Sequence, residues 1–426
     1  MKKFTWLLTI ALVLVFAVSC GDSKKEEKEK PDSDEISDEE PAETDGDAEP
    51  AETDGDAEPA DDSDREPAEE PEVDPLKCED FAEGLNENLI VGEGKDGLAR
   101  SFYLRLPENV DSMEKVPVIF LYHGYGDTAD NFEKYFSSYV NSEEMPFILV
   151  APESRGDIYG FNNIPPSGLD WDMMNLTDSS AEGDMFDALL SCLETRWNID
   201  ERHIHVTGFS AGAITADSIA LQKSDKVASI LSWSGAYFSN PKSRDALGEL
   251  MGMKIGDFFS WPDFEEDHNK YPQIFVSGEK ESDSWGYQGF FTIDFNVMAH
   301  LDGEYLSDMG HDVMICNHGE DHTIAGIMQD EMIKFFHDHP FGTVESPYKE
   351  AMPEEFAEVC HFFTEDDIIK EETEDPDDEP GENDDDEPAE NDDDEPAEND
   401  DDEPEETPDE TSEIPDEHPC FLRSCD

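Results

Sequence analysis

The fold is decided by the stretch His203-Ile-His-Val-Thr-Gly-Phe-Ser-Ala-Gly-Ala-Ile-Thr-Ala-Asp217. Its first five residues favour a β-strand, and the sequence AGAITADSIAL from Ala211 onward favours a helix. A G-x-S-x-G turn centred on Ser210 joins them, and its small residues let the strand and the helix approach closely. This context favours a strained, nucleophilic serine over a glycine-rich connection whose serine only caps the helix.

Apolar strand patterns alternate with helical patterns on both sides of this stretch. The expected strands are Ala99–Leu106, Pro117–Tyr122, Phe147–Ala151, His203–Thr207, Ala228–Trp233, Gln273–Ser277 and Asp312–Cys316. The expected helices are Gly183–Arg196, Ala211–Gln222, Phe291–Asp308 and Ile324–His337. Several strands are continuous apolar runs, which is typical of a mostly parallel sheet covered by helices on both faces. Functional residues of such sheets gather at the carboxyl ends of the strands.

The loop His123-Gly124-Tyr125-Gly126 directly follows one of these strands. A His-Gly loop at this place commonly donates a backbone N–H to an oxyanion hole, and the residue after the nucleophile supplies the second N–H. We therefore expect Tyr125 and Ala211 to be the two donors. Tight-turn glycines alone would explain the loop, but not its coincidence with the turn around Ser210.

A histidine-containing loop, Cys-Asn-His-Gly-Glu-Asp-His at positions 316–322, follows the last expected strand. His318 and His322 compete for the role of general base, and we favour His322 because it lies next to the expected helix start. His318 would then orient the loop or cap the strand. The i, i+4 pair also resembles half of a zinc site, but Gly319 stands where a metalloprotease has its glutamate, so we expect no metal ion.

The acid that would complete a triad belongs after the strand QIFVS, where Glu281 and Asp283 are the candidates. We favour Asp283, because Lys280 can draw Glu281 outward and aspartate is the commoner acid in such triads. Charged loop residues are also commonly only solvated. Among aromatic residues, Tyr122, Trp171 and Phe209 could line a substrate pocket or belong to the core.

Five segments carry a family resemblance: RSFYLRLP at 100–107, LYHGYGDTADNF at 121–132, WNIDERHIHVTGFSAGA at 197–213, CNHGEDHT at 316–323 and FFHDHPFG at 335–342. From about residue 97 to 342 the chain resembles the polyhydroxybutyrate depolymerase and feruloyl esterase group of α/β hydrolases. The resemblance implies the α/β-hydrolase fold and serine-dependent ester hydrolysis without a metal or organic cofactor. The implied substrates are feruloyl- or acetyl-type carbohydrate esters or short polyesters. Glu281 occupies the usual place of the family's acid, so it stays a rival to Asp283.

The N-terminus, MKKFTWLLTIALVLVFAVSC, has two lysines followed by a short apolar run. It predicts a signal peptide over residues 1–20 that ends in a lipobox-like Ala-Val-Ser-Cys, with Cys20 as the lipidated residue. The alternative is ordinary cleavage that leaves Cys20 as a free thiol. Gly21 after the cysteine is compatible with an exported lipoprotein at the outer membrane or cell surface.

Two strongly acidic, repetitive segments flank the region that we expect to fold. Residues 31–75 contain 22 Asp/Glu and one Arg, and residues 371–419 contain 29 Asp/Glu and no Lys or Arg. Segments with so little apolar content cannot offset the entropy of folding. We therefore expect a disordered linker over 21–76, one catalytic domain over 77–370 and a disordered tail over 371–426. The net charge of −84 excludes nucleic acid as a partner.

Apart from Cys20, the chain has the cysteines Cys78, Cys192, Cys316, Cys360, Cys420 and Cys425. An even number of cysteines in an exported chain favours disulfides over free thiols, although the spacing alone leaves the pairing open. Two other functions stay open at this stage. One is a serine peptidase of the same fold, and the other is a non-catalytic surface display or adhesion protein.

Overall fold

The computed structural model describes residues 75–92, 98–154, 171–173, 180–259, 261–287, 291–324 and 328–370. All of them belong to one compact unit that begins at Pro71. The expected signal peptide with Cys20, most of the two acidic segments, and Cys420 and Cys425 lie outside the described residues.

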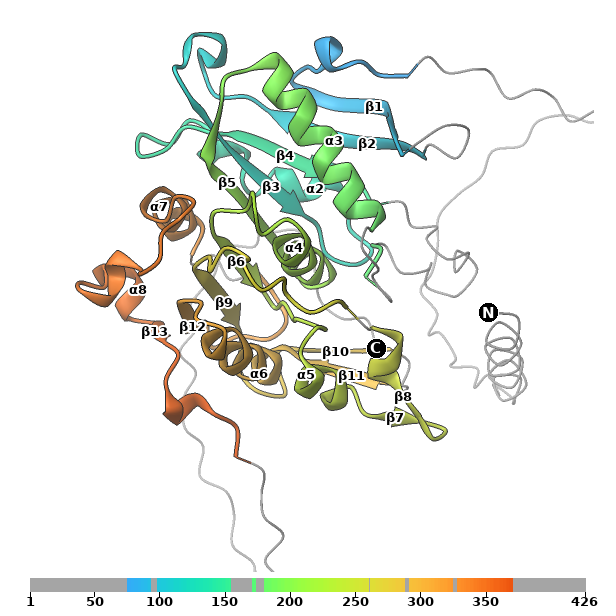
Figure 1. The fold of residues 1–426 in the computed structure, drawn as a ribbon, viewed down its shortest axis with the longest axis vertical. Helices are drawn as coiled ribbons and strands as arrows, with labels where there is room; N and C mark the ends of the chain where they lie inside the picture. The colour runs from blue at the N-terminus through green and yellow to red at the C-terminus, as the bar shows by residue number, and fades with distance from the viewer. Residues whose placement is uncertain are drawn as a thin grey trace, which may run out of the picture. The chain divides into compact units, whose positions relative to one another are not determined.

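A nine-stranded sheet with the strand order β1-β2-β4-β3-β5-β6-β9-β12-β13 forms the centre of this unit (Figure 1). Its strands are β1 (Gly84–Val91), β2 (Leu98–Arg105), β3 (Val116–Tyr122), β4 (Ile148–Pro152), β5 (Ile199–Phe209), β6 (Ile230–Trp233), β9 (Gln273–Ser277), β12 (Val313–Asn317) and β13 (Cys360–Phe362). The six strands from β4 through β12 pair in parallel, whereas β1, β2 and β13 pair antiparallel at the two edges. Each of the seven predicted strands corresponds to one of these, and the chain has the predicted α/β-hydrolase fold.

Helices cover both faces of the sheet. The longer ones are α3 (Ala181–Arg196), α4 (Ala211–Gln222), α6 (Phe295–Asp308) and α7 (Gln329–Asp338), and the shorter ones are α2 (Ala129–Glu133), α5 (Pro241–Ala246) and α8 (Glu354–Ala357). Alternate residues of one strand point to opposite faces. In β3, Val118 and Phe120 accordingly pack in the core cluster with α3, α4 and α6, whereas Ile119 and Leu121 pack in the cluster with α2, α7 and α8.

Short elements complete the described chain. Two hairpins are formed by β7 (Glu249–Leu250) with β8 (Met253–Lys254) and by β10 (Ser284–Tyr287) with β11 (Phe291–Asp294). The 3₁₀ turns are η1 (Cys78–Asp80), η3 (Val110–Ser112), η4 (Ser137–Tyr139), η6 (Ile255–Phe258), η7 (Pro347–Lys349) and η8 (Glu365–Asp367).

Two expected helices begin later than the sequence suggests. The segment predicted as the helix Phe291–Asp308 starts with the strand β11, because Asp294 ends the strand and caps α6 by accepting the N–H of Val297. The helix expected from Ile324 begins at Gln329. Met328 before it has a φ of 76°, which a right-handed helix cannot contain.

Four of the predicted disulfide cysteines form two bonds. Cys78 in η1 is bonded to Cys192 in α3, and Cys316 in β12 is bonded to Cys360 in β13. The first bond ties the N-terminal segment to a helix, and the second ties the edge strand β13 to its neighbour. Among the described residues, no helix is both long and apolar enough to traverse a bilayer.

Candidate active site

Ser210 lies in the turn between β5 and α4 with φ 54° and ψ −122°, a conformation that costs a non-glycine residue energy. Its N–H donates to the carbonyl of Trp233 at 2.9 Å, which extends the ladder between β5 and β6. A Cβ atom on Gly212 would lie 2.1 Å from the carbonyl oxygen of Tyr122, and one on Gly208 would lie 2.5 Å from the backbone of Gly212. The glycines of the motif are therefore required by close backbone contacts.

His322 lies between Ser210 and Asp283. Its Nε2 atom is 2.9 Å from Ser210 Oγ, and its Nδ1 atom is 2.7 Å from Asp283 Oδ1. A carboxylate can only accept, so Nδ1 carries the proton and Nε2 is left to accept the hydroxyl proton of Ser210. The imidazole is held between the rings of Phe209 and Phe295, at centroid distances of 4.7 and 4.8 Å.

Asp283 is completely buried, and its carboxylate is surrounded by donors. Besides His322, it accepts the N–H of Gly278 at 2.8 Å and the hydroxyl of Ser234, whose Oγ lies 3.1 and 3.0 Å from the two oxygens. A buried carboxylate without such donors would carry a large desolvation penalty. The site therefore accommodates a negative charge behind the imidazole.

The two rival residues lie elsewhere. Glu281 is exposed with a φ of 70°, and its backbone N–H donates to Asp294 Oδ2. His318 is half-buried, its N–H donates to Ser277, and its Nδ1 accepts the N–H of Glu320. Burial lowers the pKa of His318 below its ordinary value. The structure thus brings Ser210, His322 and Asp283 together and leaves Glu281 outside the hydrogen-bonded series.

The two predicted oxyanion donors flank Ser210 in different ways. Ala211 is the first residue of α4, where a backbone N–H has no acceptor within the helix and carries the positive end of the helix dipole. Tyr125 lies in the loop after β3, and its ring contacts that of Trp285 at 5.6 Å. The indole N–H of Trp171 donates to the carbonyl of His123 and thereby holds the first residue of this loop in place.

An apolar pocket opens beside Ser210. Its described lining residues are Tyr125, Met173, Ser210, Ala211, Ile214, Phe238, Phe259, Trp285, Ile293 and Phe295. None of these described residues is charged. Of the aromatic residues singled out from the sequence, Tyr122 and Trp171 are fully buried core residues, and Phe209 packs against the imidazole.

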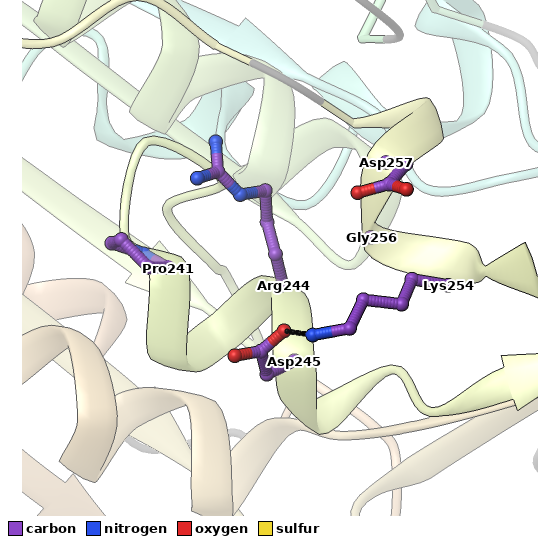
Figure 2. Close-up of a pocket in the computed structure, with 6 residues that line it drawn as sticks. All are labelled: Pro241, Arg244, Asp245, Lys254, Gly256 and Asp257. Atoms are coloured by element: carbon purple, nitrogen blue, oxygen red, sulfur yellow. Dashed lines mark hydrogen bonds and ion pairs between the residues drawn. The ribbon is translucent and has the colours of Figure 1, made fainter.

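A second hollow has charged walls and shares no lining residue with the first. It is lined by Pro241, Arg244, Asp245, Lys254, Gly256 and Asp257 (Figure 2). Lys254 forms an ion pair with Asp245 at 2.8 Å, and the guanidinium of Arg244 donates to the carbonyl of Phe238. Arg244 thus links this charged hollow to Phe238, a residue that lines the apolar pocket.

The described residues contain one group with metal-ligand spacing, formed by Glu144, His337 and Asp338. These side chains lie at the surface, and the ammonium of Lys334 is 3.5 Å from Glu144 and 3.0 Å from Asp338. A cation of the chain itself therefore already offsets part of the negative charge of this group. The His318–His322 pair, which resembles half of a zinc site in sequence, does not belong to it.

Several residues around the triad carry no signal in the sequence pattern. Ser234 follows the short strand β6 in an ordinary Ser-Gly pair. The pocket residues Phe238, Phe259, Trp285 and Ile293 come from segments outside the recognisable motifs. Only the three-dimensional arrangement brings them together, although the Ser-Gly pair at a strand end marks a tight turn.

Part of the chain is similar in sequence to known esterases. Residues 109–253 match the phospholipase/carboxylesterase family. Feruloyl esterase D of Neurospora crassa is 27% identical over 199 residues, which cover 41% of this chain and 63% of that protein. The chain thus spans less than two thirds of the length of this curated relative.

Solved structures share the fold at low sequence identity. The crystal structures of native pOPH and native sOPH superpose with TM-scores of 0.52 and 0.50, each at 16% identity. Both matches cover 70% of this chain, together with 99% and 98% of the respective structures. The chain is therefore an α/β hydrolase by fold, and by sequence it resembles the carboxylesterases and feruloyl esterases, as the motifs predicted.

Proposed function

We propose that this protein is a serine hydrolase that cleaves carboxylic esters through an acyl-enzyme. The observation that carries the proposal is the hydrogen-bonded series from Ser210 Oγ to His322 Nε2 and from His322 Nδ1 to Asp283, at 2.9 and 2.7 Å. This series, on a strained turn at a strand end, is the arrangement that activates a serine hydroxyl.

In the proposed reaction, Ser210 Oγ attacks the ester carbonyl while His322 Nε2 takes the hydroxyl proton. Asp283 stabilises the imidazolium, and the N–H groups of Ala211 and Tyr125 stabilise the oxyanion. Loss of one such donor typically raises the barrier by about 2.7–4 kcal/mol. His322 then protonates the leaving alcohol, and a water molecule, activated by the same imidazole, hydrolyses the acyl-enzyme.

The apolar pocket supports an ester with an apolar acyl or aryl group. Aromatic walls such as Phe238, Phe259 and Trp285 offer apolar surface against which a feruloyl ring or the chain of a short polyester can pack. The net charge of −84 disfavours substrates that are themselves strongly anionic. Feruloyl- or acetyl-type carbohydrate esters and short polyesters are therefore the substrate classes that we propose.

Two observations support a place of action outside the cytoplasm. The bonds Cys78–Cys192 and Cys316–Cys360 are typical of an oxidising compartment. The lipobox-like sequence around Cys20 supports a lipid anchor. In this proposal the acidic linker is the tether between the lipid anchor and the catalytic domain.

The test is an assay of the full chain with p-nitrophenyl acetate and butyrate, methyl ferulate, short polyester oligomers and peptide amides. The wild type should hydrolyse esters and react with a fluorophosphonate probe, and the Ser210→Ala variant should do neither. Faster cleavage of the amides would favour the peptidase. A folded wild type without turnover or labelling would overturn the proposal in favour of the display protein.

A further inference from the structure

Ser234, at the end of β6, contacts the triad acid from the side opposite to His322. We infer that Ser234 is a positioning residue, whose hydroxyl holds the Asp283 carboxylate turned toward the imidazole. The inference rests on the proposed function, because it assigns a role within the same catalytic series.

The hydroxyl of Ser234 is shared between both carboxylate oxygens. Its Oγ atom lies 3.1 Å from Oδ1 and 3.0 Å from Oδ2 of Asp283. Oδ1 also faces His322 Nδ1, and Oδ2 also accepts the N–H of Gly278. A donor that bridges both oxygens resists rotation of the carboxylate, so it fixes the direction in which Oδ1 meets the imidazole.

Both partners are inaccessible to water that could replace the hydroxyl. Ser234 is 1% exposed and Asp283 is 0% exposed. A buried carboxylate that loses a donor cannot recover it from solvent, so the remaining donors must carry the whole charge. We therefore expect the hydroxyl to matter more here than at a surface position.

The backbone of Ser234 gives an independent argument. Its φ is 55°, which glycine adopts freely and serine adopts only with strain. The turn is held in place, because the N–H of Ser234 donates to the carbonyl of Val276 at 2.8 Å. A glycine would fit this backbone better than a serine, so the hydroxyl is the reason that a side chain is present.

Two variants separate the hydroxyl from the strain. Ser234→Gly removes the hydroxyl and relieves the strain, whereas Ser234→Ala removes the hydroxyl and keeps the strain. If the hydroxyl positions Asp283, both variants lose kcat by about 10- to 100-fold, by analogy with the hydrogen-bond partners of metal-binding residues, and KM stays unchanged. Thermal unfolding should show the glycine variant to be the more stable of the two.

A spectroscopic readout makes the test independent of turnover. The NMR resonance of the His322 Nδ1 proton, which the short bond to Asp283 moves downfield, should shift in both variants. Asn109→Gly is the matched control, because Asn109 is exposed, has a φ of 61° and lies away from the triad. It should change neither kcat nor the resonance.

Two outcomes would overturn the inference: a Ser234→Gly enzyme with the wild-type kcat, or one with an unshifted Nδ1 resonance. Failure of the proposed function looks different, because Ser210→Ala would then equal the wild type in turnover. In that case the resonance alone decides whether Ser234 positions Asp283.

Discussion

Two serines at neighbouring strand ends have nearly the same φ and different surroundings. Ser210 after β5 has a φ of 54°, and Ser234 after β6 has a φ of 55°. Each N–H donates to a carbonyl at the end of the next strand, that of Trp233 or Val276. The hydroxyl of Ser210 faces the pocket and His322, whereas that of Ser234 is closed in against Asp283.

The two turns differ in the segment that comes directly after the serine. After Ser210 the helix α4 begins at once, so its unpaired N–H groups surround the hydroxyl with positive potential. After Ser234 the chain runs on to Asn240 before the helix α5 begins, so no helix starts directly at this hydroxyl. A serine with a positive φ therefore presents its hydroxyl to the pocket in one place and supports a carboxylate in the other.

Removing the Ser210 hydroxyl is the most severe test of the difference between the Ser210 and Ser234 turns. Ser210→Gly should lower kcat by about 10⁶, the loss typical for a triad nucleophile, while relief of the strained φ stabilises the fold. Single-turnover ester hydrolysis and thermal unfolding measure the two effects. Residual activity near that of Ser234→Gly would show that the two turns do not differ in the proposed way.

Removing the charge of Asp283, which contacts Ser234 and His322, should have the next largest effect on kcat. Asp283→Asn should lower kcat by about 10⁴, because the wrong imidazole tautomer is then stabilised. Glu281→Gln is the matched control, since Glu281 is exposed in the same loop. Steady-state kinetics on one activated ester compare them. A crippled Glu281→Gln enzyme beside a near-normal Asp283→Asn enzyme would reverse our choice of acid.

Asp302 is another buried aspartate near the segment that follows Ser234, and it can be compared with Asp283. Asp302 accepts the N–H of Tyr237 and the hydroxyl of Ser243 but faces no cation in the described part of the chain, and burial raises its pKa to about 7. The folded state therefore binds a proton that the unfolded state releases near pH 4.

The contribution of Asp302 to the free energy of unfolding is complete below about pH 4. As the pH rises from there to about 7, this contribution falls by up to about 4 kcal/mol. Asp302→Asn should flatten this part of the curve, whereas the Ser234 variants should retain it. Urea unfolding at several pH values measures the slope. An unchanged slope in Asp302→Asn would contradict the assignment.

The smallest effects concern the glycines near the serines. A Cβ on Gly212 meets the backbone oxygens of Tyr122 and His123, whereas one on Gly235 meets the side chain of Asp217 at 2.4 Å. Both alanine variants should lose about 1–3 kcal/mol of stability through overpacking. Only Gly212→Ala should also lower kcat, since it displaces the oxyanion loop. Equal kcat values in the two variants would count against this role of the loop.

Local sequence predicts the central strands and the Ser210 turn, because continuous apolar runs mark buried strands and the G-x-S-x-G pattern marks the turn, although the strands pair with partners far away in the chain. The edge strand β13 spans only Cys360–Phe362, and such a short strand depends on pairing with β12 rather than on its own pattern. The hairpin strand β11 resembles a helix in sequence because its apolar residues continue the spacing of α6, and only Asp294 interrupts them.

The acid and the pocket are harder to predict for a different reason. Glu281 and Asp283 are two residues apart in one loop, and what separates them is a turn in which Glu281 has a φ of 70°. No residue type in that loop requires this turn. The pocket walls come from β10, β11, the end of η6 and the segment after β6, so their meeting is a property of the whole fold.

The two disulfides have a consequence for a chain that is cut by a protease. Cys78–Cys192 joins residues 114 positions apart and encloses the His123 segment, and Cys316–Cys360 joins residues 44 positions apart and encloses His322. A single cut inside either loop leaves both fragments covalently attached. Ser210 and Asp283 lie between the loops, so a cut there leaves two fragments that neither of these two disulfides joins and that, within the described residues, the packing of the sheet holds together. A nick near His123 or His322 thus leaves the chain covalently continuous, whereas a nick near Ser210 does not do so through these two bonds.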